Sequence, residues 1–317
     1  MIGPLYPHKR QILTNTRMKT LLTALLFSLA TVTLTAQETP LTLNLQKGQP
    51  ITIKTHNKQR IQQTASGQQM AFDVSTDRVV TANLLEKTAQ ELTLSITYDT
   101  LRSVTKSAMF NRETNSALPG NEPIEKVLNK LSQTAMVVKI TPTGRFLRFE
   151  NYAQLREDIL RVLDDVPASK KDAALKQAEA LIKESALRSM VEPLFSYLPE
   201  KAVKVGETWE TSYISTSNDI SSIVLSNNTV KSQSEGSLTY TTVGQLESLP
   251  ATDPNAQISM DIKGSSTGEG SIDIKTGLRP LDTEKASYKG TTTVKQMGQE
   301  TSIPMTIDSE STTIMTW

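Results

Sequence analysis

Apolar and polar residues alternate along most of this chain, with the period of two that is typical of β-strands. Leucines occupy every second position in residues 41–45. The alternation resumes at Ile51 and Ile53 after a Lys-Gly-Gln-Pro sequence at residues 47–50. A break of this kind between two alternating runs predicts a hairpin.

Further alternating runs follow before residue 150. A Ser-Gly turn at residues 66–67 separates two of them. The next run places Leu92, Leu94 and Ile96 on one face, which predicts another half-buried strand. Residues 108–123 are polar and rich in turn formers, and we expect a loop there.

One phrase occurs twice in the chain: an alternating strand, then Thr-Gly, then a second strand. It spans residues 137–151 and residues 270–287, with the turn glycines at Gly144 and Gly277. Two interpretations stay open. The chain either contains a duplicated β half or forms one long meander whose turns share the same chemistry.

The period changes to that of a helix after Asn151, which we expect to cap a first helix with Gln154 as its capping-box partner. Pro167 ends this helix, and a second helix is predicted from Ser169 to the break at Pro193. The predicted inner face consists of Tyr152, Leu155, Ile159, either Val162 or Leu163, Val166, Leu175, Ala178, Leu181 and Ile182.

The β pattern returns from residue 203 to the end of the chain, with predicted hairpin turns at residues 235–236, 267–268 and 297–298. Thr, Ser and Gln alternate with Ile, Val and Leu, so each strand should have one solvent-exposed face and one buried face. Only the helical segment carries apolar stripes long enough to cover the buried face.

The predicted fold class is therefore α+β: a large curved antiparallel sheet wrapped on an inserted helical pair. The sheet is expected to be a half-barrel or a two-halves meander. We divide the chain into a signal peptide at residues 1–36 and one domain at residues 37–317. Within that domain, residues 37–150 form the first β half, 151–197 the helical insertion and 198–317 the second β half.

The first residues have the pattern of a secretory signal. Met18 is the expected start, Lys19 supplies the charge, and an apolar run from Leu21 to Leu29 leads to cleavage after Ala36. The apolar run is shorter than the ~20 residues that a membrane-spanning helix needs. An uncleaved membrane anchor is the alternative. We expect an exported protein of the periplasm or cell envelope, with no membrane span after signal removal.

The composition excludes several classes of function. The chain has no cysteine, so it has no disulfide, no thiolate metal site and no lipid anchored on cysteine. Residues 1–36 contain four basic residues and no acidic one, so the mature chain has a small net negative charge. A protein that binds nucleic acid needs a basic surface, so we expect no nucleic-acid partner.

Catalytic and metal-binding groups are scarce. After processing, His56 is the one histidine, on the polar side of its strand, where a solvated side chain and a general base are the two interpretations. A zinc site made of histidines is excluded, and Ser-His-Asp catalysis would depend on His56 alone. We predict no cofactor, no metal and no catalytic residue, and the residue inventory favours a non-enzymatic protein.

Trp209 is the internal tryptophan and follows a turn at the entry to a strand. It is interpreted either as a core residue between sheet and helices or as the wall of an apolar pocket. The candidate ligand-pocket residues are Trp209, Phe146, Leu155 and Ile159.

Four phrases resemble a secreted bacterial domain-of-unknown-function family of β-rich cell-envelope proteins: LTLNLQKGQPITIKT, ITPTGRFLRFEN, YLPEKAVKVGETWETS and SIDIKTGLRP. The most specific part is LPEKAVKVGETW, at residues 198–209. The resemblance covers most of the mature chain and implies an exported envelope protein. It supplies no catalytic or binding residue, and the alanine-rich residues 168–188 depart from it.

The expected function is a non-enzymatic binding module for a lipid or other apolar ligand, or for an envelope protein partner. The one-sided sheet and the helical insertion motivate this hypothesis, with the helical pair as plug or lid. A structural or adhesion module that pairs through sheet edges is the alternative. A hydrolase that uses two carboxylates is a further alternative.

Overall fold

The computed structural model describes residues 41–65, 67–217, 220–250, 256–296 and 299–317. The predicted signal at residues 1–36 and the predicted turn residues Ser66, Met297 and Gly298 lie outside the described residues. The described residues belong to one compact unit. None of the helices in this part of the chain is long and apolar enough to cross a membrane.

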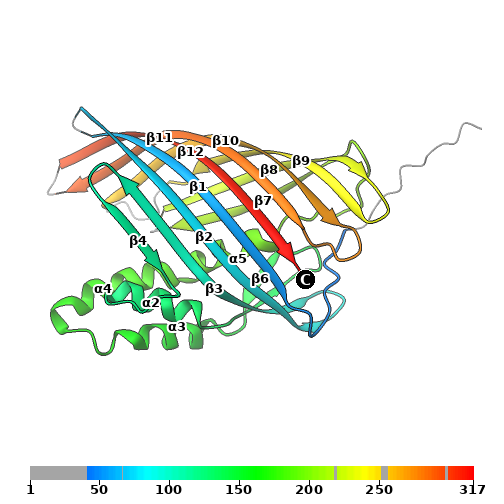
Figure 1. The fold of residues 1–317 in the computed structure, drawn as a ribbon, viewed down its shortest axis with the longest axis horizontal. Helices are drawn as coiled ribbons and strands as arrows, with labels where there is room; N and C mark the ends of the chain where they lie inside the picture. Colours follow the sequence, from blue (N-terminus) through cyan, green and yellow to red (C-terminus); the bar gives the residue numbers. More distant parts are fainter. Residues whose placement is uncertain (1–40, 66, 218–219, 251–255, 297–298) are drawn as a thin grey trace, which may run out of the picture. The chain divides into compact units, whose positions relative to one another are not determined.

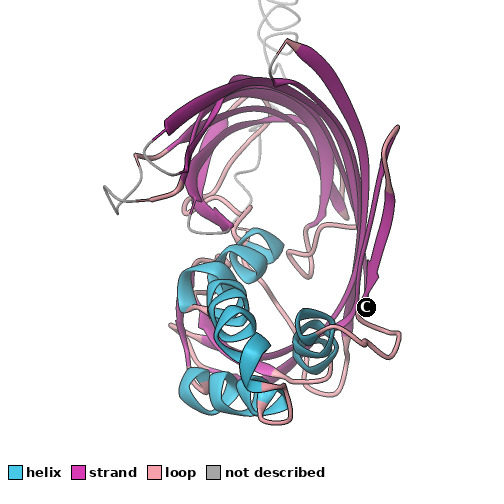
Figure 2. Ribbon diagram, turned by 90° about the vertical axis from the view of Figure 1, so that its left-hand side faces the viewer, coloured by secondary structure: helices cyan, strands magenta, loops and turns pink. Residues whose placement is uncertain are grey.

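Twelve strands form a single antiparallel sheet that curls around an interior (Figures 1 and 2). The strands are β1 (Ile51–Ala65), β2 (Gln68–Lys87), β3 (Leu92–Ser107), β4 (Asn111–Asn115), β5 (Met136–Ile140), β6 (Phe146–Phe149), β7 (Thr208–Ser217), β8 (Ile220–Gln233), β9 (Ser237–Ser248), β10 (Ile258–Asp273), β11 (Leu281–Gln296) and β12 (Gln299–Thr316). The predicted fold class, a large curved antiparallel sheet with helices against it, is confirmed.

The strand order is β6-β5-β3-β2-β1-β12-β11-β10-β9-β8-β7, with β4 paired to β3. Neighbours in this order are consecutive in the chain except at β5·β3 and β1·β12. The first and last strands of the chain therefore pair in the middle of the sheet, with Thr52 opposite Thr316. This is a meander; whether its halves arose by duplication stays a prediction.

Two elements in residues 108–132 differ from the prediction. The segment expected to be a loop contains β4, whose polar residues pair with β3 at the side of the sheet. Neither face of β4 is apolar, so no alternation marks it. The helix α2 (Pro123–Ser132) follows, with Glu125 accepting a hydrogen bond from the Glu122 backbone and with Val127 and Leu131 buried.

The insertion consists of α3 (Tyr152–Leu160), a 3₁₀ turn (Arg161–Leu163), α4 (Ala168–Ile182) and α5 (Glu184–Phe195). Leu155, Ile159 and Leu163 are buried, as predicted for the first helix. The predicted second helix is two helices, because the backbone is extended at Lys183, with ψ of 151°. Pro193 lies within the last turn of α5 and does not break it. The predicted helical pair is therefore three α-helices.

Asn151 is the N-cap residue of α3, as predicted, but its side chain makes no capping hydrogen bond. Its side chain bonds the β5 end of the sheet instead: Nδ2 donates to the Ala135 carbonyl at 2.9 Å, and Oδ1 accepts from the Val137 N–H at 2.9 Å. Gln154 donates to Asp158 at 2.9 Å and does not complete a capping box. Asn151 thus ties the start of the insertion to β5.

The inner face of the sheet is apolar at one end and polar at the other. On β1, Ile51 and Ile53 are buried in the core, whereas Thr55 and Asn57, further along the same face, line a cavity. The helices lie against the apolar end (Figure 2). The Tyr98 hydroxyl donates to the Met190 carbonyl, which joins β3 to α5. The buried core is therefore confined to the part of the sheet that the helices cover.

Residues 41–45 do not form the predicted strand. They run as an extended segment. Its three leucines, at alternate positions, are buried, and its backbone is hydrogen-bonded to both Thr-Gly turns. The Leu43 N–H donates to the Pro142 carbonyl at 2.7 Å, and the Asn44 N–H donates to the Thr276 carbonyl at 2.8 Å. The repeated strand–Thr-Gly–strand sequence therefore forms two turns, and both turns are hydrogen-bonded to residues 41–45.

A second segment binds the same two turns. The Ser196 hydroxyl donates to the Gly144 carbonyl, and the Tyr197 hydroxyl donates to the Gly277 carbonyl, each at 3.0 Å. Both glycines have positive φ, +88° and +72°, which a residue with a side chain rarely adopts. The end of α5 and the start of the described chain are thus fastened at these turns.

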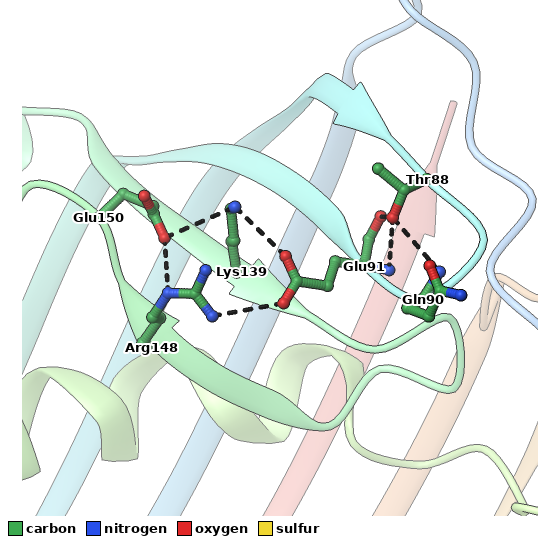
Figure 3. A network of polar contacts seen from close by, with 6 residues as sticks. All are labelled: Thr88, Gln90, Glu91, Lys139, Arg148 and Glu150. Atoms are coloured by element: carbon green, nitrogen blue, oxygen red, sulfur yellow. Dashed lines mark hydrogen bonds and ion pairs between the residues drawn. The ribbon is translucent and has the colours of Figure 1, made fainter.

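An ion-pair network holds the β5–β6 hairpin to the sheet (Figure 3). Glu91 contacts Lys139 at 3.2 Å and Arg148 at 3.3 Å, and Glu150 contacts Arg148 at 2.8 Å. The hydrogen bond from Lys139 is the main cause that lowers the pKa of Glu91, with a smaller contribution from Arg148. The groups are solvent-accessible, so salt should weaken this attachment.

We predict that Gly277→Ala lowers the free energy of unfolding by about 3 kcal/mol, because a Cβ there would overlap the Thr42 carbonyl in addition to straining φ. Gly206→Ala is the matched control, with φ of +87° and no atom within 4 Å of the added Cβ. It should cost about 1 kcal/mol. Urea unfolding measures both, and equal losses would contradict the proposed role of the turn.

Candidate functional site

A cavity of about 640 Å³ lies between the inner face of the sheet and the helices α4 and α5. Its sheet wall is rich in hydroxyl and amide side chains. These include Thr55, Asn57 and Gln59 on β1, Ser309, Ser311 and Thr313 on β12, and Ser226, Asn228 and Thr242 on β8 and β9. The volume is in the range of roughly 300–1,000 Å³ that is usual for small-molecule sites.

The helical wall of the cavity is apolar. It consists mainly of Ala180 and Leu181 on α4 and of Ala186, Met190, Pro193 and Leu194 on α5. Leu181, Met190 and Leu194 are only partly buried, so their side chains are available to a ligand. The cavity therefore places an apolar wall opposite a wall of hydrogen-bonding groups.

Glycines on β10 make room for two tyrosines on the sheet wall. A Cβ at Gly270 would overlap the Tyr240 hydroxyl, and a Cβ at Gly264 would contact the Tyr288 ring at 2.7 Å. The hairpin predicted at residues 267–268 is wrong, because β10 runs without a break from Ile258 to Asp273. The glycine of the predicted turn, Gly268, lies instead against β11, where a Cβ would meet the Thr283 carbonyl oxygen at 2.5 Å.

A buried charged cluster forms one part of the cavity lining. Arg279 and Asp282 are ion-paired at 3.3 Å with side chains only 13% and 20% exposed. The Tyr240 hydroxyl donates to the other carboxylate oxygen at 2.8 Å. The Arg279 guanidinium lies 4.6 Å from the centre of the Tyr197 ring. Burial opposes the charge on Arg279, but its pKa is raised because Asp282 stabilises that charge.

Trp209 supports this cluster from the core side. Its indole N–H donates to the Tyr197 carbonyl at 3.0 Å, and its ring meets the Tyr240 ring edge-on at 5.5 Å between centres. Trp209 is buried, as are the other three predicted pocket residues, Phe146, Leu155 and Ile159. None of the four lines the cavity described above.

Glu284 is the second carboxylate on the inner face of β11. Burial is the main cause that raises its pKa; a hydrogen bond with Ser266 opposes the shift, and the charge of Asp282 adds to it. Burial also raises the pKa of Tyr288 to about 12. Asp282 and Glu284 are two residues apart on one strand face, the kind of carboxylate pair that the hydrolase alternative requires. Asp282, however, is already bound to Arg279 and Tyr240.

His56 lies on the outer face of the sheet, away from the cavity lining, and is 46% exposed. Its Nδ1 lies 2.6 Å from Asp77 Oδ1, and the hydrogen bond from His56 is the main cause that lowers the pKa of Asp77. The spacing Gly-x-Ser-x-Gly occurs at residues 264–268, but inside β10 and not at a strand-to-helix turn. The described residues contain no group of three or more His, Cys, Asp or Glu side chains placed to hold a metal.

The sequence prediction missed the polar groups of the cavity, among them Arg78, Tyr240, Arg279, Asp282 and Glu284. Their one signal is weak: Asp282 and Glu284 stand at alternate positions of β11, in the same phase as Ala286 and Tyr288. Charged residues at alternate positions read as a solvated face when the curvature of the sheet is unknown.

The charge on Arg279 depends on Asp282, and we predict that Asp282→Asn lowers the free energy of unfolding by about 3 kcal/mol. Glu284→Gln is the matched control on the same strand face. The folded-state pKa of Glu284 lies above its ordinary 4.5, so the ionised form weakens the fold. At about pH 8 the control should be at least as stable as the wild type, and the two should converge below pH 4.5, where the carboxyl is neutral in both states. Equal losses in both variants would contradict this assignment.

The sequence model of the Family of unknown function (DUF6263) matches residues 89–279. No curated protein matches the sequence. A structure described as lipid-protein interactions in lipovitellin is similar over 86% of this chain, with 11% identity and a TM-score of 0.40, and the chain spans only 25% of that protein. The outer membrane protein OprG from Pseudomonas aeruginosa matches over 86% of this chain and 99% of its own, with 5% identity and a TM-score of 0.22. With TM-scores this low, neither likeness extends to function.

Proposed function

This chain belongs to the family of unknown function DUF6263, and from the geometry of its cavity we propose that it is a non-enzymatic binding module for an amphiphilic, lipid-like ligand. The apolar part of the ligand would lie against α5, and its polar part would face the sheet. The observation that supports this proposal is the pairing of an apolar helical wall with a hydroxyl-rich sheet wall around about 640 Å³.

A ligand of mixed polarity fits this cavity better than a purely apolar one. Hydroxyl and amide groups that face a hydrocarbon lose hydrogen bonds with water, which costs free energy. Thr55, Asn57 and Ser311 on the sheet wall would each face such a loss with a purely apolar ligand. A fully polar ligand, in turn, would leave Met190 and Leu194 in contact with polar groups.

We predict that the protein binds the neutral apolar dye N-phenyl-1-naphthylamine with a rise in fluorescence, and that Ala286→Trp weakens this binding by about tenfold or more. Ala286 lines the cavity between Glu284 and Tyr288, so an indole there would occupy the space of the ligand.

Ser287→Trp is the matched control for this experiment, because Ser287 is the next residue of β11 and faces outward, where it bonds Asp308. It should bind the dye as the wild type does. Native mass spectrometry of gently purified protein would identify a retained ligand. Equal dye binding by all three proteins would place the dye outside the cavity and contradict the proposal.

Export to the cell envelope is a separate part of the proposal, supported by the signal pattern from Met18 to Ala36 and by the lack of cysteine. When the chain is expressed from Met18 in a bacterium, we expect the product in the periplasmic fraction. Its mass should correspond to a chain that begins at Gln37. An uncleaved product in the cytoplasmic fraction would contradict this part alone.

An adhesion module that pairs through sheet edges is less well supported. At one edge strand, β7, the Thr216 N–H donates to the Ser189 hydroxyl of α5 at 2.7 Å. The helix therefore occupies hydrogen-bonding positions that a partner strand would need.

A further inference from the structure

Arg78 on β2 is placed differently from the other charged residues of the cavity. It lies opposite Thr55 on β1 and Leu101 on β3, both of which also line the cavity. Its side chain is exposed, and its charge acts on the buried hydroxyls of Tyr98 and Tyr213, which face the interior.

The other cations that line the cavity are already neutralised. Arg279 is paired with Asp282 at 3.3 Å. Arg102 is directed to the outer face of the sheet, on the side of His56, where it is paired with Asp77 at 3.1 Å and with Glu113 at 2.8 Å. Within the part of the chain that the structure describes, Arg78 has no carboxylate within ion-pair distance. It is therefore a cation of the cavity that is free to bind an anion from outside.

Arg78 also lies where the two walls of the cavity meet. Its neighbour Leu101 is apolar and partly buried, and the Tyr98 hydroxyl bonds the Met190 carbonyl, which brings α5 against β3 beside it. On its other side, the hydroxyls of Thr55 and Thr313 lie 3.2 Å apart. A charged group, hydroxyl donors and an apolar strip thus occur together.

We infer that the ligand carries an anionic head group, a carboxylate or a phosphate monoester, and that Arg78 binds this group while the alkyl chain lies along α5. The inference rests on the proposed function and names the chemistry of its ligand. The planar guanidinium offers parallel N–H donors that match the oxygens of either group. The Thr55 hydroxyl can donate a further hydrogen bond.

A cationic or neutral head group fits the same place less well. A cation would meet Arg78 with like charge and would have to compete with Arg279 for Asp282. Glu284, the remaining carboxylate of the lining, lies near the Arg279–Asp282 pair, whose charges act on it. A neutral head group would leave Arg78 bound to water alone.

The test uses three ligands with one alkyl chain and different head groups: decanoate, decyl phosphate and decan-1-ol. Titration calorimetry at about pH 8 should show that the wild type binds both anions more tightly than the alcohol. Arg78→Met should weaken the two anions by about tenfold, which corresponds to the loss of one charged hydrogen-bonded contact, and should leave the alcohol unchanged. Retained alcohol binding also shows that the variant is folded. Arg78→Lys should keep part of the preference for anions.

Arg112→Met is the matched control, because Arg112 is an exposed arginine on β4 and does not line the cavity. It should bind all three ligands as the wild type does. If the wild type binds the alcohol as tightly as the anions, or if Arg78→Met weakens all three equally, the inference fails while the proposed function stands. If the wild type binds none of the three, the proposed function fails, and the inference fails with it. A preference for only one of the anions would identify which head group the site takes.

Discussion

The structure depends on a change of chemistry partway along the inner face of the sheet. Ile51 and Ile53 on β1 are buried, whereas Thr55 and Asn57 on the same face line a cavity. Length explains this change. At 12 residues α5 is about 18 Å long, whereas the 20 residues of β2 extend about 66 Å. The helices can therefore cover only part of the inner face, and the rest must tolerate water, so its side chains are polar.

Closure of the covered end depends on two turns that the chain makes with the same residues. Gly144 and Gly277 adopt positive φ. Their carbonyl oxygens accept hydrogen bonds from the side chains of residues 196 and 197. Residues 41–45 bond the backbones of both turns. One apolar segment and the end of α5 thus connect parts of the sheet that are far apart in strand order. The core beneath them is sealed without any covalent link between strands, which suits a chain that has no cysteine.

Charge inside the cavity is almost completely compensated by neighbours from different strands and loops. Arg279 is held by Asp282 from the start of β11, by Tyr240 from β9 through that carboxylate, and by the Tyr197 ring from the segment after α5. Trp209 contacts both tyrosines from the core side, through a hydrogen bond to the Tyr197 carbonyl and an edge-on ring contact with Tyr240. Such a cluster can keep a buried guanidinium charged, because its interactions with several groups together offset the free energy lost when the guanidinium leaves water.

The sequence by itself determined the strand alternation, the turns at Gly144 and Gly277 and the buried helical face of Leu155 and Ile159, because each depends on residues a few positions apart. Only the tertiary structure decided what depends on distant partners. Gly268 on β10 suggests a turn until the Thr283 carbonyl of β11 is seen against it. The polar strand β4 is recognisable only beside β3. Arg78, Asp282 and Glu284 read as a solvated strand face, because an alternating pattern separates two faces of a sheet but does not state which of them the curl will enclose.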